Sequence, residues 1–147
     1  MIYIGSDHRG FQLKESLKKY LAELGETVED VGNTALDPED DYPDFAAAVA
    51  RKVAEAPEKN RGILLCGSGI GVDIVANKFK GVQSGLCLTP EMAEMGRNDD
   101  DINVLALAAD FTDQETAKAI VRVFLETLFS GEEKHKRRVE KIAATES

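Results

Sequence analysis

The amino-acid sequence predicts an α/β protein with a doubly wound, Rossmann-like parallel sheet of five strands, flanked by helices and followed by a helical C-terminal tail. Two observations favour this class. Short apolar runs alternate with longer segments whose apolar residues recur at helical spacing, and glycine or proline marks several boundaries between them. The 147 residues suffice for one sizeable core, and no linker or internal repeat interrupts them, so we expect a single domain over residues 1–147.

The first two strands are expected in the N-terminal third of the chain. Residues 2–6 form a short apolar run, and the leucines that follow share one face of a helix: Leu13, Leu17, Leu21 and Leu24. Gly25 is the expected end of that helix, and residues 27–31 are the second strand. The acidic stretch 37–41 is typical of a solvated turn, after which Pro43 lies in the first turn of the second helix.

The remaining strands are three further apolar runs, at residues 62–65, 83–88 and 103–108. A helix is expected after each, namely residues 69–79, a helix beginning at Pro90, and a long helix carrying Ala117, Ile120, Val121, Phe124, Leu125 and Leu128. Because a helix follows every strand, we expect the strands to run parallel. The segment 129–147 departs from this rhythm. It holds a basic cluster in an acidic protein and few apolar residues, so we expect it to pack on a second subunit.

The charge balance excludes some classes of partner. The formal net charge of −9 argues against nucleic acid or an anionic membrane as the main partner. No apolar stretch is long enough to cross a bilayer, and the N-terminus is typical of a strand rather than a signal peptide. The two cysteines, Cys66 and Cys87, give no disulfide framework, so we expect a cytoplasmic protein in which Cys87 has a packing role.

Cys66 stands where an apolar strand turns into a helix. It follows Ile63–Leu65 directly and precedes the loop Gly67–Gly71, with the sequence GSGIG. The N–H groups of such a loop converge, and the helix N-terminus adds positive potential, so we expect the thiol to lose its proton easily and an anionic oxygen to be held nearby. The spacing matches neither the G-x-G-x-x-G of dinucleotide sites nor a P-loop. In the alternative interpretation Cys66 is only a small core residue.

Other polar residues follow predicted strand ends. Asp7 and His8 follow the first strand, Cys66 and Ser68 end the third, and we expect the neighbourhood of the acidic run 99–101 at the same edge. In doubly wound sheets, ligands bind beyond the carboxyl ends of the strands, near the switch in strand order. These residues are therefore expected to gather around one small-molecule site.

Five motifs occur in an order that resembles the ribose-5-phosphate isomerase B family: Ser6–Gly10, Asp41–Phe45, Cys66–Gly71, Ala76–Lys78 and Asn103–Ala106. Galactose-6-phosphate isomerase subunits belong to the same superfamily, and the resemblance spans essentially the whole chain. It implies an aldose–ketose isomerase that moves a carbonyl between C1 and C2 of a sugar phosphate through a cis-enediolate, without metal or organic cofactor. It also implies a homodimer, or a tetramer, whose active sites combine residues of two subunits.

The resemblance also implies roles for individual residues. Cys66 is the base, and Val72 stands where some members carry a glutamate base instead. The enediolate oxygen is held by Ser68 and by the amides of Gly67, Gly69 and Gly71. Sugar hydroxyls are bound, or ring opening is assisted, by Asp7, His8 and Tyr42. The phosphate is bound across the dimer by Lys134, His135 and Arg138.

Four residues depart from the family pattern. Asp99 replaces the ring-opening histidine and Asp100 a substrate-binding asparagine, and both stay candidate site residues. Asp110 replaces a phosphate-binding arginine, whereas Arg9 stands where the family has a small or apolar residue. Arg9 therefore either supplies the missing positive charge or pairs with one of these three aspartates.

Three alternatives follow from these departures. The first is the same chemistry on a different sugar, even an unphosphorylated one, and the second is a non-catalytic sugar-phosphate-binding relative. The intact loop around Cys66 argues against the second. The third is a hard-cation site formed by residues 99–101 with Asp110, which is disfavoured because consecutive aspartates do not converge easily. For residue Asp101 itself we expect only a solvated loop position.

Overall fold

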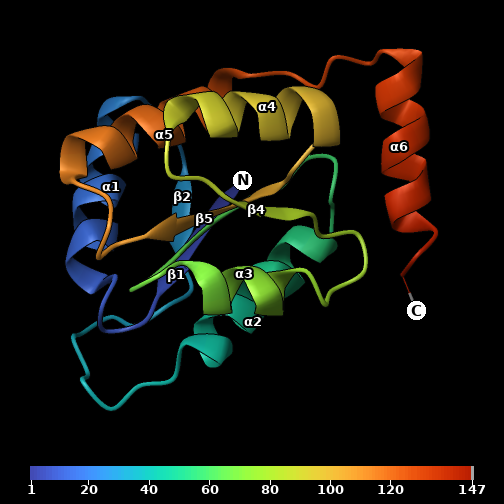
Figure 1. The fold of residues 1–147 in the computed structure, drawn as a ribbon. Helices are drawn as coiled ribbons and strands as arrows, with labels where there is room; N and C mark the ends of the chain where they lie inside the picture. Colours follow the sequence, from blue (N-terminus) through green and yellow to red (C-terminus); the bar gives the residue numbers. More distant parts are fainter. Residues whose placement is uncertain (147) are drawn as a thin grey trace.

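Five parallel strands form the sheet, in the order β2-β1-β3-β5-β4 (Figure 1). The computed structural model describes residues 1–146. The strands are β1 (Ile2–Ser6), β2 (Val28–Asp30), β3 (Arg61–Cys66), β4 (Ser84–Leu86) and β5 (Val104–Ala108). The chain pairs β1 with β2 on one side and then with β3 on the other, so the strand order switches between β1 and β3. The predicted doubly wound class is confirmed.

Helices cover both faces of this sheet. They are α1 (Phe11–Glu23), α2 (Tyr42–Ala54), α3 (Ile70–Ala76), α4 (Pro90–Asp100), α5 (Gln114–Glu126) and α6 (Glu133–Ala143). Helices α1, α4 and α5 pack on one face, and α2 and α3 pack on the other (Figure 1). Two apolar clusters result, one between each helix layer and the sheet.

The alternation of side chains along β3 decides which cluster each residue joins. Ile63 and Leu65 face α1 and α5, while Leu64 and Cys66 face α2 and α3. All four are buried, as expected for a central strand covered on both faces. The side chain of Cys66 therefore lies on the side of the sheet that α2 and α3 cover.

The ends of most elements agree with the turn residues in the sequence. Gly25 adopts φ 79°, and the N–H of Glu26 donates to the carbonyl of Leu21 at 3.0 Å, so α1 ends where predicted. The fourth strand is shorter than the predicted 83–88, because β4 pairs with only Val104–Ala106 of β5. The last long helix ends at Glu126, before the expected residue Leu128, which is exposed.

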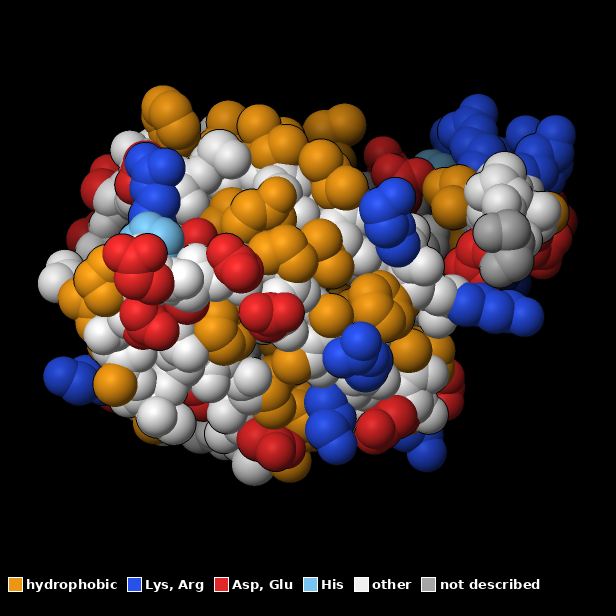
Figure 2. Space-filling view, turned by 90° about the horizontal axis from the view of Figure 1, so that it is seen from below, with side chains coloured by type: hydrophobic (Ala, Val, Ile, Leu, Met, Phe, Trp, Pro, Cys, Tyr) orange, Lys and Arg blue, Asp and Glu red, His pale blue; other side chains and the backbone are white. Residues whose placement is uncertain are grey.

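The tail forms a helix that stands apart from the two layers. Helix α6 packs against the outer side of the molecule at α4 (Figure 1). Figure 2 shows lysine and arginine side chains gathered on this projecting part. Residue 147, at the end of the predicted tail segment, lies outside the described residues. Among residues 1–146, no helix has the length and apolar character that crossing a membrane requires.

Candidate active site

The neighbouring strands β1 and β3 end side by side and open into a cavity of about 320 Å³. The cavity lies at the switch in strand order, where doubly wound sheets bind ligands. Its walls come from the loops after β1 and β3 and from the start of α2 and of α3, and the lining residues are Asp7, Arg9, Tyr42, Cys66, Gly67, Ser68, Ile70, Gly71 and Ile74. Exposed hydrophobic side chains of α3, Ile70 and Ile74, lie beside it, and Figure 2 shows apolar atoms spread over this face.

Cys66 lies in a well-anchored stretch of backbone beside this cavity. The residue is only 5% exposed and belongs to the apolar cluster under α2 and α3. Its carbonyl accepts a hydrogen bond from the N–H of Ala109 at 2.9 Å, and the carbonyl of Gly67 accepts one from Asp110 at 2.9 Å. The backbone of the loop after β3 is therefore fixed to the segment after β5, and Cys66 lines the cavity from this anchored position.

The glycines after Cys66 are required by close contacts. Gly69 adopts φ 73°, and a Cβ there would lie 2.5 Å from Cδ1 of Leu86. A Cβ on Gly71 would lie 2.4 Å from Cε1 of Tyr42, so the tyrosine ring packs directly on that backbone. Ser68 Oγ accepts the N–H of Ile70 at 3.2 Å, which leaves its O–H to donate to a ligand. The loop thus presents a hydroxyl and backbone amides beside the thiol.

Asp7 is fixed by the turn that it begins. Its carboxylate is buried, and Oδ1 accepts the N–H groups of Arg9 at 3.0 Å and of Gly10 at 3.2 Å. A Cβ on Gly10 would lie 2.7 Å from Cβ of Leu65, so only glycine lets this turn lie against β3. The second carboxylate oxygen of Asp7 is left to accept a hydrogen bond from a ligand hydroxyl.

Arg9 pairs with Asp110, which decides between the partners proposed from the sequence. Its guanidinium forms an ion pair with the carboxylate of Asp110, from the loop after β5. Both groups lie over Gly67, since a Cβ there would be 2.7 Å from Arg9 Cζ and from Asp110 Oδ2. The two side chains are 58% and 35% exposed, so we expect this pair to contribute little stability but to set the charge at the mouth of the cavity.

His8 is held by Asp40, a residue that the sequence analysis did not select. Both the backbone N–H and Nδ1 of His8 contact Asp40 Oδ1, at 3.0 and 2.7 Å. The hydrogen bond to Asp40 raises the pKa of His8, with a smaller contribution from Asp7. The side chain of Asp40 is only 5% exposed, so the prediction of a solvated turn at 37–41 is wrong for this residue. A contact across 32 positions leaves no local signal in the sequence.

Three side chains with potential metal-ligand atoms lie close together in this part of the site. Ligand atoms of Asp7, His8 and Asp40 all lie within 4.8 Å of one another. The hydrogen bonds already described account for this closeness, because they use the atoms Nδ1 of His8, Oδ1 of Asp40 and Oδ1 of Asp7. The hard-cation site considered from the sequence, residues 99–101 with Asp110, is not brought together within one chain. Asp110 lies at the mouth of the cavity, whereas residues 99–101 end α4.

The remaining predicted site residues form a second group. Asp99 and Asp100 belong to the last turn of α4. The chain then enters β5 at Val104, so both residues lie near the amino edge of the sheet. The expectation that the run 99–101 neighbours Cys66 at the carboxyl edge is therefore wrong within one chain, because the run ends a helix instead of a strand. Asp101 is half-exposed and pairs with the buried Arg97 at 2.9 Å, so it is not simply solvated.

The tail residues join this second group. His135 is buried, with Nε2 3.6 Å from Asp99 Oδ1 and Nδ1 2.5 Å from Ser130 Oγ. Lys134 and Arg138 lie on exposed positions of α6. Among the described residues that line the Cys66 cavity, none comes from α4 or α6. The two groups of predicted residues therefore lie at opposite edges of one chain.

A doubly wound sheet with a buried thiol, a glycine loop and a polar turn at its switch point defines a small-molecule-binding α/β protein. The chain belongs to the Ribose/Galactose Isomerase family, whose sequence model matches residues 2–142. The resemblance stated from the five motifs is thus confirmed.

Individual relatives agree with this assignment. The chain is 44% identical over 142 residues to a probable ribose-5-phosphate isomerase B of Mycoplasma genitalium, covering 96% of this chain and 92% of the relative. It is 41% identical over 145 residues to ribose-5-phosphate isomerase B of Escherichia coli, covering 99% and 95%. The crystal structure of the Mycoplasma genitalium enzyme with bound ribulose-5-phosphate superimposes with a TM-score of 0.94 at 41% identity, covering 97% of this chain and 93% of that chain.

Proposed function

We propose that this protein interconverts ribose 5-phosphate and ribulose 5-phosphate, with Cys66 as the base. The observation that carries the proposal is the placement of Cys66, buried and anchored beside a cavity whose walls also supply Ser68 and the glycine loop. Membership of the isomerase family and the relative with ribulose-5-phosphate bound support the same reaction.

The proposed chemistry needs one proton to move between adjacent carbons. The Cys66 thiolate removes the proton from C2 of the open-chain aldose, and the electron pair shifts toward the carbonyl to form a cis-enediolate. Ser68 O–H and the loop amides of Gly67, Gly69 and Gly71 hold the negative oxygen. The thiol then returns the proton at C1, while the hydroxyl proton passes from O2 to O1, which gives the ketose. Asp7 and Tyr42 bind the sugar hydroxyls.

A second subunit completes the site in this proposal. Asp99, which would assist ring opening, and Asp100 lie far from the cavity in their own chain, as do the basic residues of α6. A homodimer, or a tetramer of such dimers, brings Lys134, His135 and Arg138 of one chain to the substrate phosphate of the other. The projecting, basic α6 supports this arrangement. We also propose a reducing, cytoplasmic compartment, since the mechanism needs Cys66 as a free thiol.

A different sugar is the second candidate for the substrate. The ion pair with Asp110 neutralises Arg9 at the mouth of the cavity, where a phosphate would favour an unpaired cation. Carboxylates such as Asp7, Asp99 and Asp100 suit neutral hydroxyls, so an unphosphorylated aldose fits this observation.

The test follows deuterium at C1 and C2 by proton NMR in deuterium oxide, with phosphorylated and free aldoses and ketoses. Wild type is expected to exchange and interconvert the ribose and ribulose phosphates. The rate of Cys66→Ala is expected to be lower by at least about 100-fold, which is the usual rate contribution of a general base. Cys87→Ala is the matched control, because burial raises the pKa of the Cys87 thiol to about 11 and removes it from acid–base chemistry.

Each result of this experiment leads to a different conclusion. Undiminished exchange in Cys66→Ala would overturn the assignment of the base. Exchange with a free sugar alone would favour the second candidate, and silence across the panel in wild type would favour a binding protein.

A further inference from the structure

A chain of polar contacts runs from the rim of the active-site cavity into the interior of the protein. It starts at His8, which stands between the cavity-lining residues Asp7 and Arg9. It passes through Asp40 and Asn33, and it ends at Lys14 on α1. None of these four residues is itself among the described residues that line the cavity.

Lys14 is the inner end of the chain and is completely buried. Its ammonium contacts the carboxylate of Asp30 at 2.8 Å and donates to the backbone carbonyl of Asn33 at 2.5 Å. Burying an unpaired ammonium would cost several kcal/mol, so both partners are needed. The segment between β2 and α2 has no helix or strand of its own, and this buried cation fixes it to α1.

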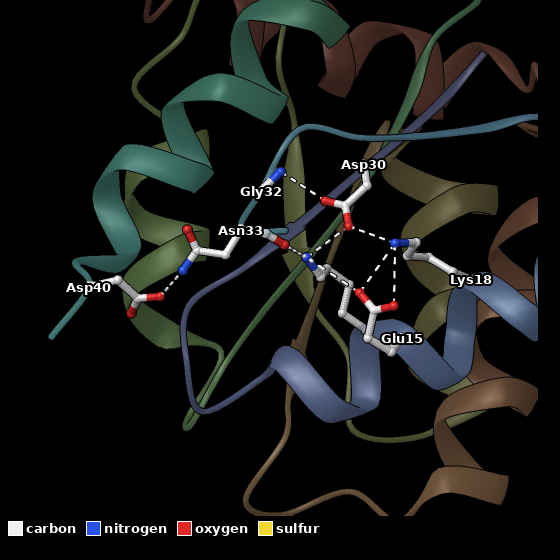
Figure 3. A network of polar contacts seen from close by, with 7 residues as sticks. Glu15, Lys18, Asp30, Gly32, Asn33 and Asp40 are labelled. Carbon is white, nitrogen blue, oxygen red and sulfur yellow. Dashed lines mark hydrogen bonds and ion pairs between the residues drawn. The ribbon is translucent and has the colours of Figure 1, made fainter. Parts of the chain in front are cut away.

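Asn33 connects the buried Lys14 to Asp40. Its carbonyl points to Lys14, while its side-chain Nδ2 donates to the carboxylate of Asp40 (Figure 3). Asp40 is a further seven residues along the same segment, so one asparagine joins both ends of the loop. With Oδ2 of Asp40 occupied by Asn33, the other oxygen faces His8.

We propose that Asp40 is a positioning residue for the isomerisation: it holds His8 by Nδ1 so that Nε2 donates a hydrogen bond to an oxygen of the bound sugar or sugar phosphate. Two contacts from one carboxylate oxygen, to the ring and to the backbone N–H, fix both the rotamer and the main chain of His8. Nε2 has no hydrogen-bond partner among residues 1–146, so it is the atom left for substrate. The role in catalysis rests on the proposed function, while the positioning is measurable without it.

Opposing effects act on the pKa of His8. The hydrogen bond to Asp40 raises it most and the charge of Asp7 adds to this, whereas burial and Arg9 lower it, so that the net result is a raised pKa. An imidazolium donates from both nitrogens, so contact with Asp40 leaves Nε2–H as a charged donor that a ligand can use. Without Asp40 the ring is free to rotate and to become neutral near pH 7.

The test is the variant Asp40→Asn, which keeps the side-chain volume but removes the charge. The protein has two histidines, so the proton NMR titration of His8 is resolved and assigned by comparison with His8→Gln. The midpoint of the His8 titration is expected to fall to lower pH. At pH 7, kcat/KM is expected to fall about tenfold, mainly through a higher KM, because one hydrogen bond to a charged group is lost. As the pH is raised, the KM of the variant is also expected to start increasing at a lower pH than the KM of wild type.

Glu39→Gln is the matched control, because it removes one exposed carboxylate next to Asp40 without touching its contacts. It is expected to leave both the His8 titration and KM unchanged. If Asp40→Asn fails to fold, Asn33→Ala breaks the same chain of contacts one step further from His8 and is judged by the same two measurements.

An unchanged His8 titration in a folded variant would overturn the proposal whatever the activity. A shifted titration with unchanged kcat/KM would overturn the role in binding. Failure of the proposed function gives a different signature, since wild type itself would then be inactive while the His8 titration still reports on Asp40.

Discussion

At the scale of single residues, charge placement around the cavity matters more than the number of charges. The chain carries a net charge of −9, yet a sugar phosphate must enter beside two carboxylates, Asp7 and Asp110. Arg9 is the one cation lining the cavity within the described part of the chain, and its guanidinium is paired with the carboxylate of Asp110. The strength of this pairing therefore decides how much positive charge the substrate meets.

Asp110→Asn should improve binding of a phosphorylated substrate. Removing the carboxylate frees Arg9 and removes a repulsion on the order of 1 kcal/mol, so we expect KM to fall by about fivefold, less at high salt. Steady-state kinetics with the phosphorylated sugar at low and high ionic strength measures this. The control is Glu126→Gln, which breaks the comparable surface pair with Arg122 on α5 and should leave KM unchanged. A rise in KM would mean that Asp110 serves to orient Arg9.

At the scale of elements, the loop after β3 combines two separate demands on one glycine. Gly69 has a positive φ and also no room for a Cβ, whereas Gly25 at the end of α1 has a positive φ with nothing within 4 Å of the added atom. Comparing the two positions separates backbone strain from steric conflict.

Gly69→Ala should therefore cost more than Gly25→Ala. We expect Gly25→Ala to lower the free energy of unfolding by about 1 kcal/mol with full activity, the cost of backbone strain alone. Gly69→Ala adds a clash with Leu86 and the backbone of Leu107, so it should cost at least about 2 kcal/mol and most of the activity. Urea unfolding and initial rates measure the two effects, and equal losses in both variants would contradict this explanation.

Lys14→Met tests the anchor of the loop between β2 and α2. Although burial acts to raise the pKa of Asp30, hydrogen bonds from Lys14 and Lys18 lower it overall. A lowered pKa stabilises the fold above the ordinary aspartate value near ~3.9, and this contribution is lost as the pH falls through the lower folded value. We expect the variant to lose about 3 kcal/mol at pH 7 and to show a weaker loss of stability on acidification.

Urea unfolding of Lys14→Met and wild type at pH 7 and at pH 3 measures this difference. Lys118→Met, which removes an exposed pair with Glu115, is the control and should cost less than about 1 kcal/mol. A Lys14→Met variant as stable as the control at pH 7 would show that the buried contacts do not hold the loop.

The sequence predicted the elements well where local chemistry decides them. Pro43 lies in the first turn of α2 and Gly25 follows the end of α1, because their backbone preferences act within one turn. The position of the run 99–101 was predicted wrongly, because its consecutive acidic residues gave no sign that α4 continues to Asp100. Asp40 was missed for another reason. Its burial depends on His8 and Asn33 closing around it, which only the assembled fold brings about.

At the scale of the whole molecule, the candidate residues divide between two edges of the chain. Cys66 and its loop lie at one edge, and Asp99 and the basic residues of α6 lie at the other. A shared site explains this division, since a two-fold related copy can bring the second group of one chain to the first group of the other.

Subunit complementation tests the shared site directly. Cys66→Ala and Arg138→Ala should each be nearly inactive as homodimers. After unfolding and refolding as an equal mixture, half of the dimers are mixed and have one intact site of two, so activity should return to about a quarter of wild type. Mixing Cys66→Ala with Cys66→Ser is the control, and no recovery is expected there. No recovery in the first mixture would place the whole site within one chain.

The two outer strands have a consequence for how the subunits can meet. Both β2 and β4 are only three residues long, and β2 carries the charged residues Glu29 and Asp30. Short, charged borders offer few unpaired peptide groups to a strand from another molecule, which is how natural sheets resist fibre formation. A continuous intermolecular sheet is therefore disfavoured, and the proposed dimer would have to form through helices and side chains instead.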